Sequence, residues 1–240
     1  MDKNDFISIS WRSPTKITRN NILRHLKRLA PKYASGKLAD LGCGVKPYHA
    51  IFEPFIKSYL GVDFAAAAEK NYGENTKADI YADCIDTKLE SEIFDTILST
   101  QVLEHISDPE KYVGECYRLL KRGGIGIFTI PFLWPLHSEP FDYYRFTKYA
   151  LEKLFMAKGF DIIELGPMEG AYAALIQAKI ISVYMRSAEK ESILRKIHRR
   201  MAGFFLVPFL NFKALYLDNL FWNDKLCLNY YLVVRKKQII

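Results

Sequence analysis

Hydrophobic and polar residues along this chain form blocks that predict short strands alternating with helices. Apolar runs with the length and composition of buried strands occur at 37–41, 59–62, 94–98, 125–130 and 160–165. Helical patterns separate several of these runs. Alternation of this kind predicts a mostly parallel sheet with helices on both faces.

Three helices are predicted, and two of them carry recognisable start and stop signals. The stretch 20–33 repeats apolar side chains at helical spacing. Asp108 and Thr147 have the side chains that cap helix N-termini. We expect the helix after Asp108 to end at the cations and glycines of 121–124, and the helix after Thr147 to stop at Gly159.

The pattern changes after residue 167. Two apolar stretches, 171–187 and 202–222, flank a charged segment, and a strand-like run follows at 226–234. We expect a single domain over 1–240. Its predicted parts are an N-terminal cap region at 1–33, a core at 34–167, a helical insertion at 168–224, and a final strand with a basic tail at 225–240.

Composition narrows the class of protein. Half of the 240 residues are hydrophobic, enough for one α/β domain, and the net charge of +7 favours anionic partners. No cysteine pair has the CxxC spacing, so we expect no metal site and no need for disulfides, which favours a reducing cytoplasm. The N-terminus lacks the apolar run of a signal peptide. The cysteines are Cys43, Cys84, Cys116 and Cys227.

A glycine-rich turn follows the first predicted strand. Gly42 and Gly44 allow tight turning and close approach of a ligand to the backbone, and Asp63 ends the next strand. A carboxylate so placed can accept both ribose hydroxyls of an adenosine. Pro47 stands where a dinucleotide fingerprint needs its third glycine, which disfavours NAD, and the chain has no P-loop lysine motif.

Three motifs carry a family resemblance. They are Leu38-Ala39-Asp40-Leu41-Gly42-Cys43-Gly44, then Phe94-Asp95-Thr96-Ile97-Leu98-Ser99 with Val102-Leu103-Glu104-His105, and Leu119-Leu120-Lys121-Arg122-Gly123-Gly124. Their order and spacing resemble class I S-adenosylmethionine-dependent methyltransferases of the type 11 branch, over about 40–165. One departure is Val45-Lys46-Pro47-Tyr48, where many relatives carry another glycine.

The resemblance implies a Rossmann-like, seven-stranded sheet with an antiparallel last strand, helices on both faces and a helical cap. It implies S-adenosylmethionine as cofactor, with Asp83 at the adenine amino group and Asp40 steadying the turn. Glu104 and His105 match helical positions that we expect to be structural. The predicted cofactor-binding residues are Asp40, Gly42, Cys43, Gly44, Asp63, Phe64, Asp83, Cys84, Ser99 and Gln101.

The segment 131–147, after the strand predicted at 125–130, supplies candidate acceptor chemistry. His137 can remove a hydroxyl proton near neutral pH, and Asp142 can orient it or act as the base. Arg145 can hold a phosphate or carboxylate, while Tyr143 and Tyr144 can shape the pocket. In the alternative interpretation, these polar side chains only tie down a long loop. The segment resembles methyltransferases linked to surface-polysaccharide and glycolipid assembly.

We therefore predict O-methylation of a small, glycan or lipid-linked hydroxyl acceptor. Carbon or nitrogen methylation and a non-catalytic, cofactor-binding scaffold remain alternatives. The insertion can be a lid, a homodimer face, or a peripheral contact at the inner face of the membrane, since basic residues precede its second apolar stretch. Pro208 and two charges interrupt that stretch, which argues against a full membrane span. No nucleic-acid-reading motif is present, so we expect no nucleic-acid partner.

Overall fold

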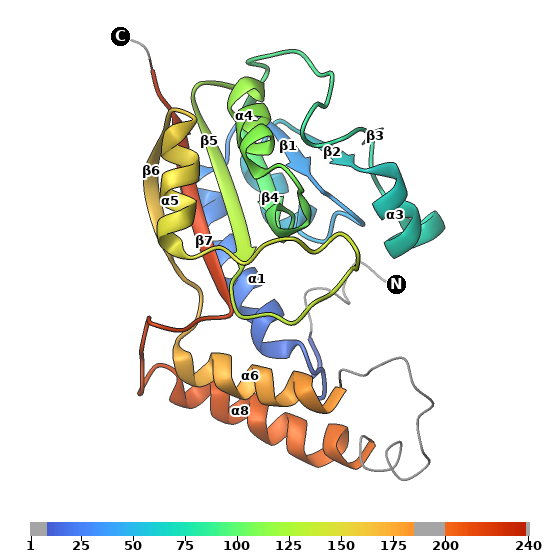
Figure 1. The fold of residues 1–240 in the computed structure, drawn as a ribbon, viewed down its shortest axis with the longest axis vertical. Coiled ribbons are helices and arrows are strands. Elements are labelled where there is room, and N and C mark those ends of the chain that lie inside the picture. The colour runs from blue at the N-terminus through green and yellow to red at the C-terminus, as the bar shows by residue number, and fades with distance from the viewer. Residues whose placement is uncertain (1–8, 185–199, 239–240) are drawn as a thin grey trace. The chain divides into compact units, whose positions relative to one another are not determined.

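The computed structural model describes residues 9–184 and 200–238, and their contacts divide them into two compact units. The sheet unit contains the described residues of 25–166 and 230–240. The helical unit contains those of 1–24 and 167–229. Figure 1 shows helix α1, Lys16–Tyr33, as one continuous ribbon. It belongs to the helical unit up to Arg24 and to the sheet unit from His25.

The sheet unit is built on seven strands in the order β3-β2-β1-β4-β5-β7-β6. The sheet is mostly parallel and its last strand is antiparallel, as the sequence predicted. The strands are β1 Lys37–Leu41, β2 Ser58–Asp63, β3 Ile80–Tyr81, β4 Phe94–Thr100, β5 Leu120–Pro131, β6 Phe160–Pro167 and β7 Asn229–Lys236.

The centre of the sheet is the pair of parallel neighbours on either side of β1. Leu38 pairs with Tyr59 of β2 and with Thr96 of β4, and all of β1 after Lys37 is buried. The chain therefore leaves β1 at the point where the strand order reverses. In open α/β sheets, ligands bind beyond the carboxyl ends of the strands at this point.

Helices follow the strands of the sheet unit. Thr147 caps α5 by accepting a hydrogen bond from the Ala150 amide, as its sequence predicted, and Asp108 caps α4 through the Lys111 amide. Phe155 of α5 packs on Phe128 of β5. The other helical segments of this unit are α2 His49–Phe52, η1 Glu53–Phe55, α3 Ala65–Tyr72, η2 Gly73–Asn75, η3 Leu103–His105, α4 Pro109–Leu119 and α5 Lys148–Ala157.

The predicted end of the α4 helix was wrong. Residues 121–124 do not close the helix, which ends at Leu119, but lie inside β5. Leu120 already pairs with Phe94 of β4, and the register shifts between Phe94 and Thr96. Gly123, with φ +77°, therefore serves an irregular strand and not a helix cap.

The helical unit is held by buried polar side chains. Asn211 of α8 donates hydrogen bonds to the carbonyls of Trp11 and Ser13. Asp218 accepts from the amides of Gly170 and Ala173 at the start of α6. The helices are the first half of α1, α6 Ala171–Tyr184, the π-helix η4 Ala202–Leu206, and α8 Val207–Leu217.

The predicted parts map onto these units with shifted limits. The insertion predicted at 168–224 lies in the helical unit where it is described, whereas the N-terminal region predicted at 1–33 is divided between both units. Of the charged segment at 189–200, positions 189–199 lie outside the described residues. Positions 185–187 of the helix predicted at 171–187 also lie outside them. None of the described helices is long and apolar enough to cross a membrane.

Candidate active site

The glycine turn after β1 has a backbone that requires glycine. Gly42 has φ +76°, and a Cβ built there would lie 2.4 Å from a methyl carbon of Val102. The amides of Gly42 and Cys43 both donate to the Val62 carbonyl, at 2.8 and 3.1 Å. The turn is thereby fastened to the end of β2.

Asp63, the last residue of β2, joins this turn to the start of the next helix. One carboxylate oxygen accepts the Gly44 amide at 2.8 Å, and the other accepts the Phe64 amide at 2.8 Å. Burial raises the pKa of Asp63, while these two backbone hydrogen bonds lower it. Each oxygen keeps a second lone pair, so the carboxylate can still accept hydrogen bonds from hydroxyl groups.

Some predicted cofactor residues lie behind the turn and not on a cavity wall. Asp40 is buried and accepts a hydrogen bond from the Tyr59 hydroxyl, and burial raises its pKa to about 7. Ser99 is buried and accepts from the Tyr112 hydroxyl at 2.7 Å. Cys43 is also buried. None of these three residues lines the cavity described next.

A cavity of about 510 Å³ lies beside the turn, entirely within the sheet unit. Small-molecule sites span about 300–1,000 Å³, so its size suits a cofactor with an acceptor. Gln101, which lines it, has φ +57°, a strained conformation that is concentrated at functional sites. Six predicted cofactor residues line this cavity: Gly42, Asp63, Phe64, Asp83, Cys84 and Gln101.

The acceptor-side loop contributes His137 and Tyr143 to the same cavity, whereas Asp142 and Arg145 stand behind them. Arg145 binds both oxygens of Asp142, at 2.6 and 2.7 Å. It also donates to the carbonyls of three loop residues, Trp134, Pro135 and Tyr144. A guanidinium has five N–H donors, and this network occupies all five.

Asp142 connects that network to His137. Burial would raise the pKa of Asp142, but the hydrogen bonds from Arg145 and the His137 amide hold it at about 2. The His137 amide donates to Asp142 at 3.0 Å. The ring Nδ1 of His137 lies 3.3 Å from Asp142 and 3.2 Å from the Pro135 carbonyl. A proton on Nδ1 satisfies both oxygens and leaves Nε2 as the proton-accepting nitrogen.

His105 and Glu104, which sequence analysis assigned to structure, lie directly beside His137. The His105 and His137 rings meet edge to face with centroids 4.7 Å apart. Glu104 is 0% exposed, neither carboxylate oxygen accepts a hydrogen bond from the described residues, and burial raises its pKa to about 8. The three side chains bring potential metal ligand atoms within 4.8 Å of one another, so a cation is one possible occupant.

Further cavity residues escaped sequence analysis because no motif marks them. Tyr72 comes from the end of α3, and Phe141 and Ser138 come from the acceptor loop. Lys70 donates to the Glu139 carbonyl at 2.6 Å, linking α3 to that loop. Tyr143, which was expected to shape the pocket, does line it. For the missed residues of the acceptor loop, the only signal in the sequence was that the loop follows the end of a strand.

The residues present fit an adenosyl cofactor. Asp63 offers carboxylate oxygens at the cavity wall, and Asp83, which also lines the cavity, is exposed. The nearby glycine turn lets a ligand approach the backbone. These features match the demands of a ribose and an adenine amino group.

Comparisons with known proteins agree with this fold. A family model of type 11, described as "Methyltransferase domain", matches residues 39–128. A probable S-adenosylmethionine-dependent methyltransferase of Mycolicibacterium smegmatis is 25% identical over 64% of this chain and 63% of its own length. A ubiquinone biosynthesis O-methyltransferase of Bradyrhizobium is 33% identical over 39% of each chain. The matched part thus spans less than two thirds of these relatives.

Solved structures share the fold across almost the whole chain. Phosphoethanolamine N-methyltransferase 2 of Haemonchus contortus, solved with S-adenosylmethionine, matches with TM-score 0.55, 19% identity, and coverage of 99% of this chain and 60% of that one. The [4+2]-cyclase SpnF matches with TM-score 0.58, 16% identity, and coverage of 96% and 86%. The solved structures show that the chain has the Rossmann-like methyltransferase fold, and the family match over residues 39–128 agrees with it.

Proposed function

We propose that this chain methylates a hydroxyl group of a small or lipid-linked acceptor, including a sugar. The observation that carries the proposal is the shared cavity, in which Gly42 and Asp63 face the same space as His105 and His137. A methyl donor and an acceptor held in one enclosed space meet the main requirement of this reaction, which is alignment away from water.

On the cofactor side, Asp63 would bind the ribose hydroxyls and Asp83 the adenine amino group. The turn at Gly42 and Gly44 would lie against the methionine part, bordered by Gln101. When bound, S-adenosylmethionine supplies a methyl group activated by its sulfonium. The protein's own task is then to hold that group and exclude water.

On the acceptor side, His137 would remove the hydroxyl proton. Its Nε2 takes the proton as the acceptor oxygen gains the methyl group, and Asp142, fixed by Arg145, stabilises the resulting imidazolium. Because all five donors of Arg145 are already engaged, we assign it to positioning and not to an acceptor phosphate. The acceptor would contact His105 and Tyr143.

A hydroxyl acceptor is favoured over carbon or nitrogen by the histidine and its carboxylate, because removal of a hydroxyl proton needs a base. The similarity to the ubiquinone biosynthesis O-methyltransferases points in the same direction. The polysaccharide and glycolipid link stays a prediction from the loop sequence.

Calorimetry followed by a methyl-transfer screen tests the proposal. We expect the full chain to bind S-adenosylmethionine and S-adenosylhomocysteine, and to transfer labelled methyl to one class among phenols, sugars and lipid-linked sugars. Cofactor binding without transfer to any hydroxyl acceptor would favour the non-catalytic scaffold. Failure to bind the cofactor would overturn both.

A further inference from the structure

The helical unit carries a dense aromatic surface that the cofactor cavity does not use. Along η4 and α8, one side is buried against the unit at Val207, Asn211 and Ala214. On the other side, Phe205, Phe209, Phe212 and Tyr216 follow one another at helical spacing, and each is between 56% and 68% exposed. We call these four residues the aromatic face.

Further large apolar side chains are exposed around the aromatic face. Such a concentration marks an interaction surface, because monomeric proteins rarely expose contiguous apolar patches of this kind. Exposed neighbours in the same stretch of chain are Met201, Phe204, Leu206, Leu220, Phe221 and Trp222, and Trp11 of the same unit packs on Phe212.

Positive charges lie beside the aromatic face. The sequence has no aspartate or glutamate in 9–39 or in 200–217. Arg12, which is exposed, holds its guanidinium 4.0 Å from the Phe204 ring, and Lys213 extends its amine to 5.8 Å from Phe209. Cations on long stems beside exposed rings are the arrangement found where a protein meets the headgroup level of a bilayer.

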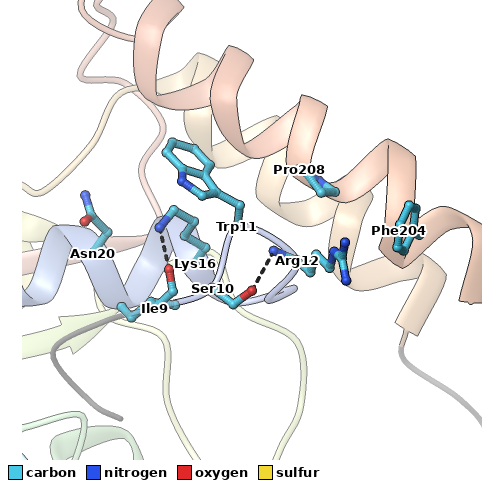
Figure 2. A pocket seen from close by; sticks show the side chains of 8 residues that line it. All are labelled: Ile9, Ser10, Trp11, Arg12, Lys16, Asn20, Phe204 and Pro208. Atoms are coloured by element: carbon cyan, nitrogen blue, oxygen red, sulfur yellow. Dashed lines mark hydrogen bonds between the residues drawn. The ribbon is translucent and has the colours of Figure 1, made fainter. Parts of the chain in front are cut away.

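An open hollow of about 630 Å³ adjoins the aromatic face in the same unit. Figure 2 shows Trp11, Arg12 and Lys16 beside the helix that carries Phe204 and Pro208. The Lys16 amine donates a hydrogen bond to the Ile9 carbonyl at 2.6 Å. The exposed Arg12 can bind an anion at the mouth of the hollow. A lipid phosphate fits this combination of guanidinium and apolar wall.

From these observations we propose that the helical unit docks on the surface of a bilayer containing anionic phospholipid. The aromatic face enters the interface, and Arg12 and Lys213 lie at the phosphates. A second copy of this chain fits less well. A two-fold dimer sets the same patch against itself, which would bring the like charges of Arg12 and Lys213 near those of the other copy.

Vesicle co-sedimentation of the full chain tests this proposal. We expect binding to vesicles of equal parts phosphatidylcholine and phosphatidylglycerol, weak binding to phosphatidylcholine alone, and weakening by added salt. Phe209→Ser with Phe212→Ser should lower the partition coefficient about a hundredfold, because both rings leave the interface. Arg12→Gln with Lys213→Gln should lower it about tenfold, and only on anionic vesicles.

The matched control removes two equally exposed apolar side chains from the sheet unit. Tyr149 and Met156 of α5 are 69% and 61% exposed, and Tyr149→Ser with Met156→Ser should leave partitioning unchanged. Circular dichroism and melting temperature establish that each variant is folded.

Three outcomes would overturn membrane docking. They are equal binding to both kinds of vesicle, an equal loss in the α5 control, and a dimer by light scattering that the Phe209/Phe212 variant dissociates while vesicles do not bind. Inorganic phosphate serves as a further probe. If millimolar phosphate displaces the protein from the vesicles, the hollow binds anions in general and the membrane proposal is overturned. Cofactor binding is measured without vesicles, so failure here leaves the proposed methyl transfer untouched.

Discussion

The two sides of the cavity are held in place by different means. On the cofactor side, Asp63 binds the amides of Gly44 and Phe64, so two neighbouring strand ends lock each other. On the acceptor side, a loop without strand or helix is held by the guanidinium of Arg145 and the buried carboxylate of Asp142. The first side depends on backbone geometry, and the second depends on one ion pair.

This difference has a functional meaning. A turn fixed by the sheet can serve any protein with the same cofactor, whereas a loop fixed by its own side chains can be shaped for one acceptor. Substitutions on the two sides should therefore separate cofactor affinity from turnover. The four predictions below run from the largest expected effect to the smallest.

Replacing His137 by Gln should separate the two sides most sharply. We expect turnover to fall about 10²-fold or more, because the proton acceptor is lost, while cofactor affinity stays unchanged. Steady-state kinetics and calorimetry measure the two effects. His49→Gln, on α2 outside the cavity, is the matched control. Unchanged turnover in the His137 variant would remove it from the mechanism.

Replacing Asp63 by Asn should act on the cofactor side alone. We expect affinity for S-adenosylmethionine to fall about thirtyfold, because charge-assisted hydrogen bonds are lost, with little change in turnover at saturation. Asp79→Asn is the control, since Asp79 also accepts a strand amide, from Gly61 at 2.6 Å, but does not line the cavity. An equal loss in both variants would mean that the sheet was damaged generally.

Replacing Glu104 by Gln should change how stability depends on pH. Burial raises the pKa of Glu104 from 4.5 to about 8, so the folded protein holds a proton that the unfolded chain releases between these values. Stability is therefore lost as pH rises through this window, and the advantage of the variant over the natural protein should grow by about 1.4 kcal/mol per pH unit.

Denaturant melts at pH 6 and pH 7 measure this advantage. Glu115→Gln is the control, because Arg118 and Thr87 lower the pKa of Glu115 despite its burial. That carboxylate is ionised in both states across this window, so its variant should show no such slope. A slope of zero for Glu104→Gln would contradict the raised pKa of this buried carboxyl.

Chelation should have the smallest effect. With His137 acting as a free base, EDTA should change turnover by less than about twofold. If activity is lost and then restored by a divalent ion, the cluster of Glu104, His105 and His137 binds metal. The assignment of His137 as base would then give way to a ligand role.

The sequence predicted the glycine turn after β1 because the signal for that turn is local. Gly42 lies at φ +76°, where a side chain is strained, and its neighbours form a strand, so turn and strand are readable together. The prediction for the end of α4 was wrong because it rested on local signals alone. Glycines and cations suggested a helix cap, but Leu120 finds its partner in Phe94, a contact that spacing does not reveal.

The acceptor side could be predicted only as a set of residue types. The sequence placed His137, Asp142 and Arg145 in one loop. It did not indicate that all five N–H donors of Arg145 would form hydrogen bonds within that loop. Sequence analysis also gave Glu104 and His105 a structural role. Their position beside His137 depends on how the loop folds back on η3, through the Tyr143 amide on the Glu104 carbonyl.

The hydrogen bonds of Arg145 fix the frame of the acceptor loop through groups that all belong to the loop itself. Its shape is set by Asp142 and three carbonyls, none of which needs a particular side chain at Leu136, Phe141 or Tyr143. Those three positions can therefore vary while the frame and the histidine stay fixed. New acceptor specificities should be accessible by randomising them together, without rebuilding the catalytic geometry.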